Sequence, residues 1–589
     1  MERIAPPVAA SEEIASRPLL RVSVALLLFL LILLLAVAMR FVQLDAIPLN
    51  EAEAEAALAT WNYWHDPDAA GVPLTSPAYF TTATPITSLF GATNDIMRGD
   101  ALTRLVPALA GLLVAVLLWS ARDALGLAGS LVAAFLLAVS PMAALISRQA
   151  GGDALALLAL VALFAGALRF RLEGSPIWPV VAAAALGFGL ATSPLFYSGL
   201  LALVGAWLVQ RRNSPAGSHD GERLDWRRLV LIAAAVFLGT ATCLLLRPAG
   251  LGGAAAQLGD WLASFALPTD VRSFFAPVAL LARYELAAVT LGAGALVWSL
   301  WRAYPLPRFL VAWYAAALVL LLAQPGQTAN VVLVALPAYL LVGQWLQQAF
   351  RDPPREATWG LVVFLLVAGI AVYFNGVRFV RLVAAQQDAL GFALLLALIL
   401  AMAIVTVNLV HGWHAPSAFQ GTLLALLVLL GAYSWSTGWW LTHRAANDPR
   451  AGLGRATDDD GRLLVEMLHE ISYQTGSEQY DLPLLSAVDT PVLRWYLRQF
   501  NAVQFGETVP PGTTTTALIT RLDGPAPSVD DYSGLDLGLL NVGVERAEQA
   551  PASAAAETLR WWLFRESRDR ITQERVILWL RQDALPWNR

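Results

Sequence analysis

The stretch RFVQLDAIPLNEAEAEAALATWNYW, residues 40–64, directly follows the first apolar run of the chain. It turns at Pro48 and then starts a helix where a membrane protein would first meet water on the far side. Asn50 has the character of an N-cap, and Glu53, three residues later, completes a capping-box pattern. The sequence therefore predicts a capped helix just outside the lipid.

Three acidic residues occupy the start of this helix. Glu51 and Glu55 share one face at helical spacing, whereas Glu53 points elsewhere. A carboxylate held just outside the lipid is a candidate catalytic group. The alternative is that acids in a first turn only complement the helix dipole.

The composition excludes most other classes of protein. The chain has 589 residues, of which 57% are hydrophobic and 14% charged, and its mean hydropathy is +0.58. Such a chain is a polytopic membrane protein with a smaller polar part. The net charge of -5 argues against nucleic acid as a partner. The single cysteine, Cys243, rules out an intrachain disulfide, and the six histidines show no metal-ligand spacing, so we expect no metal site from them.

Apolar runs divide the chain. Residues 1–18 form a polar tail, and residues 19–441 form a transmembrane domain with an outer loop at 41–100. A span-length window predicts a mainly α bundle of about thirteen spans. They lie near 19–40, 101–119, 127–146, 153–171, 176–191, 194–210, 229–247, 277–301, 307–324, 329–350, 357–375, 389–411 and 418–441.

Charge placement orients these spans. With a cytoplasmic N-terminus, most arginines between spans fall on the cytoplasmic side, as the positive-inside rule requires. An odd number of spans then places the loop 41–100 and everything after 441 outside. We expect an integral protein of a bacterial plasma membrane.

Three outer segments are too long to be turns, namely residues 41–100, 247–276 and 375–388. Within the first, residues 76–90 predict an interfacial or re-entrant helix, and the other two predict outer loops. Residues 442–589 predict an extracytoplasmic α/β domain. Its expected elements are helices at 458–473 and 491–500, strands at 482–488, 517–520 and 575–581, and a loop at 550–556.

A second polar cluster is SPMAALISRQAGGD, residues 140–153. Arg148 and Asp153 lie in a short outer loop between two predicted spans. The Gly151-Gly152 pair allows a tight turn and the close approach of a ligand. The alternative is that Asp153 only caps the following helix.

Four stretches together resemble a known superfamily. They are PLNEAEAEA (48–56), SPAYFTTATPITSLFG (76–91), RLVPALAG (104–111) and SPMAALISRQAGGD (140–153). In order and spacing they are similar to the first four spans of GT-C integral-membrane glycosyltransferases, which include protein O-mannosyltransferases and the aminoarabinose transferase.

The resemblance implies transfer of a sugar, with inversion, from a polyprenyl-phosphate donor to a glycan, lipid or protein acceptor on the outer face. The family's general base maps to Glu51, and its second acid maps to Asp153. Two positions depart from the family pattern, because Asn50 replaces an Asp and Gly151 replaces a basic residue. Arg148 is a candidate replacement for that basic residue.

Physical chemistry is consistent with these roles. A carboxylate that deprotonates an attacking hydroxyl is worth on the order of a hundredfold to ten-thousandfold. A leaving phosphate needs cations, and arginine forks suit it. The outer arginines that break the charge bias are Arg148, Arg272, Arg378 and Arg381, although each could instead contact lipid headgroups. Asn50, Glu55 and Tyr79 complete the candidate substrate-binding set, membrane lipid is a further partner, and a divalent metal is left open as a cofactor.

Three other functional interpretations of the sequence compete with this one. Asp458-Asp459-Asp460 matches the DxD pattern of nucleotide-sugar transferases, but it opens a helix, so capping is favoured. A transporter or lipid flippase would suit the many spans, although no inverted repeat is seen. A non-catalytic relic of the family, anchored in the membrane, would suit the departures at Asn50 and Gly151.

Overall fold

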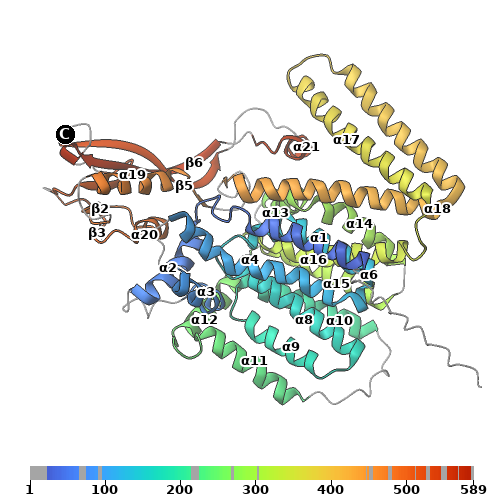
Figure 1. Ribbon diagram of the computed structural model, residues 1–589, viewed down its shortest axis with the longest axis horizontal. Coiled ribbons are helices and arrows are strands. Elements are labelled where there is room, and N and C mark those ends of the chain that lie inside the picture. Colours follow the sequence, from blue (N-terminus) through green and yellow to red (C-terminus); the bar gives the residue numbers. More distant parts are fainter. Residues whose placement is uncertain are drawn as a thin grey trace, which may run out of the picture.

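The computed structural model shows a helical bundle with a sheet domain at one end (Figure 1). It describes residues 23–65, 74–90, 96–213, 225–266, 271–301, 304–445, 448–449, 455–474, 480–510, 513–524, 531–545, 554–567 and 570–584. The predicted tail 1–18 lies outside the described residues.

The apolar runs form the helices of the bundle. They are α1 (Val24–Phe41), α2 (Glu51–His65), α3 (Pro77–Phe90), α4 (Ile96–Ser120), α5 (Arg122–Leu125), α6 (Leu127–Val139), α7 (Pro141–Ile146), α8 (Asp153–Glu173), α9 (Ile177–Gly189), α10 (Pro194–Asn213), α11 (Trp226–Ala241), α12 (Gly250–Ala263), α13 (Val271–Tyr284), α14 (Leu286–Trp301), α15 (Pro305–Ala323), α16 (Asn330–Ala349), α17 (Glu356–Ala384) and α18 (Leu390–Trp440). A π-helical turn, η2 (Leu441–Ala445), follows α18.

Each of the thirteen predicted spans overlaps a helix among the described residues, but the count of about thirteen spans is not confirmed. The predicted span 229–247 runs past α11, which ends at Ala241. Among the described residues, seven helices are long and apolar enough to cross a membrane, or eight if the bent pair α13 and α14 is one span. The helices α6 and α9 are apolar but shorter. These helices make the chain an integral membrane protein.

The helix α16 forms the centre of the bundle, since 83% of its apolar window is buried. It is apolar around its whole circumference and packs on α6, α14 and α15, as expected of a helix enclosed by others. Gly343 of α16 crosses Gly129 of α6 so closely that a β-carbon on either would meet the other's backbone. Small residues allow this backbone approach.

The helices α17 and α18 differ from the prediction. The expected outer loop 375–388 is mostly helix, because α17 continues to Ala384. The 51-residue α18 bends at His414, whose φ of -156° is not helical, just before Pro416. Proline removes one backbone donor and crowds the preceding turn, which accounts for the kink. The first half of α18 pairs with α17 in a hairpin that projects from the bundle, and the second half lies along the bundle (Figure 1).

The C-terminal segment forms a six-stranded mixed sheet in the order β1-β5-β6-β4-β2-β3. Its strands are β1 (Ala456–Thr457), β2 (Leu484–Ser486), β3 (Val503–Phe505), β4 (Ala517–Arg521), β5 (Tyr532–Glu545) and β6 (Arg570–Arg581). The β3-β2-β4 part is parallel, and β1, β5 and β6 pair antiparallel. Its helices are α19 (Asp460–Gln474), α20 (Pro491–Leu497) and α21 (Ala554–Phe564). The helix α21 begins within the predicted loop 550–556, whose residues 550–553 are outside the described part.

The helix α2 connects the two parts of the molecule. Its residues Ala54 and Ala57, with Leu49 before it, are buried in the same core as Leu493 and Tyr496 of α20. The helix after the first span therefore belongs to the hydrophobic core of the C-terminal domain as well as to the bundle.

Candidate active site

The start of α2 has the predicted cap. The Asn50 side-chain oxygen accepts from the Glu53 backbone N–H at 2.9 Å, and the Glu53 carboxylate accepts from the Asn50 N–H at 3.1 Å. These reciprocal bonds confirm the capping box. They also turn the Glu53 side chain inward, away from the face of Glu51 and Glu55.

Glu53 is buried against Arg104 of α4. The guanidinium Nε donates to Glu53 Oε1 and Nη2 donates to Oε2, each at 2.8 Å. The Ala150 N–H donates to Oε1 at 2.8 Å as well. With the Asn50 bond, four donors satisfy this carboxylate, so Glu53 holds three segments together and has little capacity to take a proton from a substrate.

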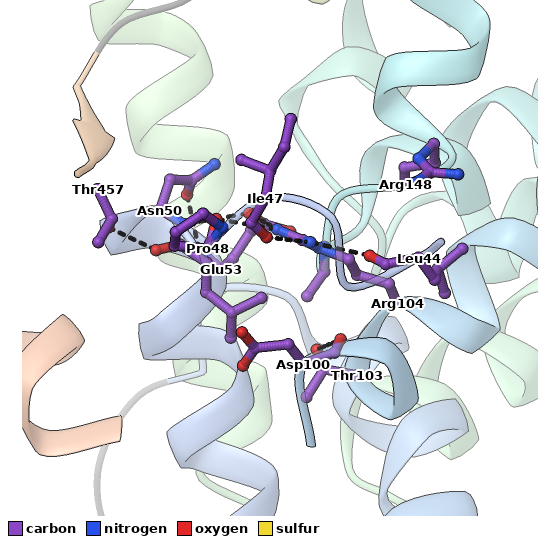
Figure 2. Close-up of polar contacts among 12 residues, drawn as sticks. Leu44, Ile47, Pro48, Asn50, Glu53, Asp100, Thr103, Arg104, Arg148 and Thr457 are labelled. Carbon is purple, nitrogen blue, oxygen red and sulfur yellow. Dashed lines mark hydrogen bonds and ion pairs between the residues drawn. The ribbon is translucent and has the colours of Figure 1, made fainter. Parts of the chain in front are cut away.

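Arg104 also fixes the turn before α2. It donates to the carbonyl oxygens of Leu44 and Ile47 at 3.0 and 2.7 Å and to that of Pro48 at 3.2 Å. Figure 2 shows the guanidinium extended between this segment and Glu53. Five donated bonds use the full capacity of an arginine fork.

Asp100, one turn before Arg104 on α4, is the docking point of the C-terminal domain. Its buried carboxylate accepts from Arg462 at 2.7 Å, from the Trp495 indole at 2.8 Å and from the Tyr496 hydroxyl at 2.9 Å. In a further hydrogen bond, the Thr457 hydroxyl donates to the Leu49 carbonyl oxygen at 2.5 Å. The domain is therefore held by hydrogen bonds to α4, at Asp100, and to the segment before α2, at Leu49.

Arg148 lies in the loop 147–152 beside the end of the first span. It donates to the carbonyl oxygens of Val42, at 2.7 Å, and Gln43. Burial and, to a lesser extent, the charge of the neighbouring Arg104 together lower the pKa of Arg148 to about 10. His443 of the π-helical turn η2 reaches the same Val42 oxygen at 3.1 Å. Single π-helical turns often occur at functional sites.

A small cavity of about 20 Å³, enough for about one water molecule, lies between these groups. Its walls come from the 47–53 segment, α4, the loop 147–152, η2 and β1. The lining residues are Ile47, Pro48, Asn50, Glu53, Arg104, Leu145, Arg148, Gln149, Thr442, Ala456 and Thr457.

Glu51, the proposed base, does not line the cavity but borders it. Its carboxylate pairs with Arg455 at 3.4 Å, and Arg455 also pairs with Glu574 at 2.5 Å. Asn50 and Ala456, the chain neighbours of this pair, are both lining residues. Partial burial raises the pKa of Glu55, one turn later, and the Glu51 charge raises it further.

Asp153, the second predicted acid, has other neighbours than Glu51. It is the first residue of α8, and the N-cap is Gly152 rather than Asp153, with no side-chain cap. Asp153 lies beside Ser193 at the start of α10. Among the residues that the structure describes, no hydrogen bond or ion pair joins Asp153 to Glu51.

The two glycines of this loop differ in how closely the rest of the protein approaches them. A β-carbon on Gly152 would overlap the Thr192 carbonyl oxygen and the Ser76 hydroxyl, whereas one on Gly151 would meet nothing within 4 Å. The close approach expected for a ligand is therefore made at Gly152 by the segment before α10. Gly151 faces open space.

The remaining predicted residues are dispersed. Tyr79 is buried and donates its hydroxyl to the Thr103 carbonyl oxygen at 2.8 Å, which is a structural contact. Arg378 and Arg381 lie on α17, and Arg381 stacks over Phe564 of α21 at 5.4 Å. The side chain of Arg272 lies outside the described residues.

The acidic triplet before α19 makes structural bonds. Asp458 accepts from the Asn541 and Gln573 side chains at 3.2 and 2.9 Å, and Asp460 accepts from the Gly538 N–H at 2.9 Å. Within the described ranges, no group of three His, Cys, Asp or Glu residues could hold a metal ion.

No sequence pattern indicated a role for Arg104 or Asp100, and the only role predicted for Glu53 was in the capping box. Arg104 opens the quoted stretch RLVPALAG, so the signal was an arginine at the start of a span. Its partner, 51 residues away, could not be identified from spacing.

Comparison with known proteins places the fold. No family model and no curated protein matches the sequence. ArnT from Cupriavidus metallidurans in the apo state matches with a TM-score of 0.51 and 17% identity over 82% of this chain and 86% of that chain. The same protein bound to undecaprenyl phosphate matches with a TM-score of 0.49 and 17% identity over 81% and 85%. The archaeal oligosaccharyltransferase AglB from Archaeoglobus fulgidus, in complex with an inhibitory peptide and a dolichol-phosphate, matches with a TM-score of 0.45 and 11% identity over 81% and 64%. The likeness to apo ArnT confirms that the chain has a GT-C-like fold.

Proposed function

We propose that this protein is an integral-membrane glycosyltransferase that moves a sugar from a polyprenyl-phosphate donor to an acceptor hydroxyl on the outer face of the membrane. The observation that carries the proposal is the position of Glu51 at the border of a cavity lined by Arg104 and Arg148, within a GT-C-like fold. ArnT, which shares that fold, has been solved with undecaprenyl phosphate bound.

Glu51 is the proposed general base because its carboxylate is accessible and weakly held. Its side chain is 27% exposed and its partner Arg455 is 46% exposed. An exposed ion pair contributes little free energy, about 0 to 1 kcal/mol, so an acceptor hydroxyl could displace Arg455. The Glu53 carboxylate, in contrast, already accepts four hydrogen bonds, three of them buried, which it would have to give up.

In the proposed reaction, Glu51 takes the proton as the acceptor oxygen attacks the anomeric carbon. The bond from that carbon to the phosphate oxygen breaks, and the configuration inverts because the two groups lie on opposite faces of the sugar. Arg148 is the proposed phosphate ligand, since its guanidinium lines the cavity and bonds only to carbonyl oxygens in the contacts described above.

Binding of the donor requires the cavity to enlarge, because its volume of about 20 Å³ is far below that of a sugar. The strand β1 forms one wall and is joined to the bundle by the Thr457 bond. We propose that β1 moves outward when donor binds. Asp153, beside Ser193 at the start of α10, is the second proposed catalytic carboxylate.

The test is a transfer assay with the purified protein in nanodiscs and a panel of polyprenyl-phosphate sugars. We expect one donor to release polyprenyl phosphate in step with the appearance of a glycosylated acceptor. Release of no sugar from any donor, with folded protein present, would contradict the proposal.

A further inference from the structure

A second and larger crevice lies in the C-terminal domain, at the carboxyl ends of its three parallel strands. Its volume is about 560 Å³, in the range of small-molecule sites. The lining residues are Ala487, Asp489, Phe505, Gly506, Glu507, Thr508, Val509, Thr520, Arg521 and Gly524.

The topology of the sheet creates this crevice. The strand β2 lies between β3 and β4 and is parallel to both. From its carboxyl end the chain runs through α20 to β3 on one side, whereas the chain leaving β4 runs to β5 on the other side. Adjacent parallel strands whose exits diverge form a topological switch point, and ligands of open α/β sheets bind in the crevice outside it.

One wall of the crevice carries an ion pair beside an aromatic ring. Asp489 accepts two hydrogen bonds from Arg494, at 2.5 and 2.7 Å, and the Arg494 guanidinium stacks over the Phe505 ring at 4.9 Å. The two charged side chains are 48% and 52% exposed, so the pair adds little rigidity. The wall therefore presents a polar pair without net charge next to an apolar ring.

The rest of the lining offers hydrogen-bonding groups without net charge. Glu507 and Arg521 are exposed and of opposite sign, and the charge of Asp489 is neutralised by Arg494. Thr508 adds an exposed hydroxyl. This balance disfavours an anion or a cation, and it suits a neutral ligand with many hydroxyls and an apolar face for the aromatic ring.

We propose that this crevice binds a neutral carbohydrate. The inference is independent of the proposed sugar transfer, because binding here requires neither donor nor Glu51. The crevice has its own connection to the bundle, since α20 begins beside Asp489 and carries Trp495 and Tyr496 to Asp100 at its other end. A glycan held here would be bound by the same domain that docks on α4.

The test measures binding to the full-length protein in nanodiscs or in a detergent without a sugar headgroup. The probes are maltotriose, cellotriose, mannotriose and chitotriose, followed by saturation-transfer NMR and calorimetry. Glu507→Gln and Arg521→Gln remove one charged hydrogen-bonding group each. The matched controls are Glu470→Gln and Arg570→Gln, at exposed positions outside the crevice.

We expect at least one trisaccharide to bind saturably, and each crevice variant to weaken its binding about tenfold, as for loss of one hydrogen bond to a charged group. The control variants should bind as the parent does. The proposal is overturned if none of the four sugars binds, or if binding is unchanged in both crevice variants. It is also overturned if a neutral pentapeptide or inorganic phosphate binds to the parent protein and loses affinity in the crevice variants, whereas the sugars do not. Because no donor is present, failure of sugar transfer leaves these outcomes unaffected.

Discussion

Glu53 and Arg104 are joined by two parallel hydrogen bonds of 2.8 Å, with both side chains about 5% exposed. The pair connects the first turn of α2 to α4, and through the Ala150 N–H it also holds the loop 147–152. The segments that surround the proposed site are thus positioned by one buried ion pair. Its neighbour Glu51 remains accessible because Glu53 occupies the inward position.

Substitution of Glu53 by Gln should destabilise the folded protein strongly. The change leaves the buried Arg104 cation without its counter-charge, which costs about 3–5 kcal/mol. Thermal unfolding in detergent should show a clearly lower Tm. Glu55→Gln, one half-turn away and exposed, serves as the control and should cause no loss. Equal Tm values for the Glu53 variant and the parent would contradict the structural role given to this residue.

The two glycines of the loop 147–152 should respond differently to alanine. Gly152→Ala places a methyl group against the Thr192 backbone and should cost about 1–3 kcal/mol through overpacking. Gly151→Ala meets open space and should be tolerated. Paired Tm measurements check this, and a Gly151 variant that is the less stable of the two would show that the loop packs otherwise.

Loss of the Asp100 charge should loosen the C-terminal domain. Asp100→Asn weakens the bonds from Arg462, Trp495 and Tyr496, which are three of the polar contacts across this boundary. Hydrogen exchange should rise in α20 and β1 while α16 stays protected. Asp536→Asn, which disturbs only an exposed pair with Arg575, is the control. Unchanged protection of α20 would argue against Asp100 as the docking point.

The pKa of Glu55 predicts a pH-dependent effect. Partial burial and then the Glu51 charge raise this pKa, so ionised Glu55 is less favourable in the folded chain than in the unfolded chain. The contribution of Glu55 to stability is complete below the ordinary glutamate pKa of about 4.3 and is lost as pH rises through the raised value. Glu55→Gln should therefore raise Tm at pH 7 and have no effect near pH 4.

The control for this pH effect is the same change made together with Glu51→Gln. Removing the Glu51 charge takes away the second cause of the raised pKa, so the gain at pH 7 should shrink. An equal gain at pH 4 and pH 7 would indicate that the effect of Glu55→Gln does not come from ionisation.

Local patterns predicted the elements around the site. The capping box at Asn50 and Glu53, the helix at 76–90 and the separation of the spans 176–191 and 194–210 depend on neighbours within a few residues, and each is present. The order of four short motifs indicated the GT-C-like fold. Span-length apolar windows predicted helices at the expected spans, but length and composition do not decide how many of them cross the membrane.

The contacts that define the site were not predictable from local patterns. Arg104 meets Glu53 across 51 residues, and Asp100 meets Tyr496 across 396 residues. No spacing rule links such positions. The continuation of α17 to Ala384 was missed because its polar residues were interpreted as a loop, and the strand β5 was missed because its glycines and polar residues obscure the alternation.

The most direct test of the account is the rate of sugar transfer by Glu51→Gln, compared with Asp536→Asn, which removes a carboxylate charge on the exposed side of β5. Expression and Tm of both variants should match those of the parent, which separates catalysis from folding. We predict that Glu51→Gln reduces transfer at least a hundredfold, as expected for loss of a general base, while Asp536→Asn retains it. Transfer by Glu51→Gln at the rate of the parent protein would contradict the assignment of Glu51 as the base.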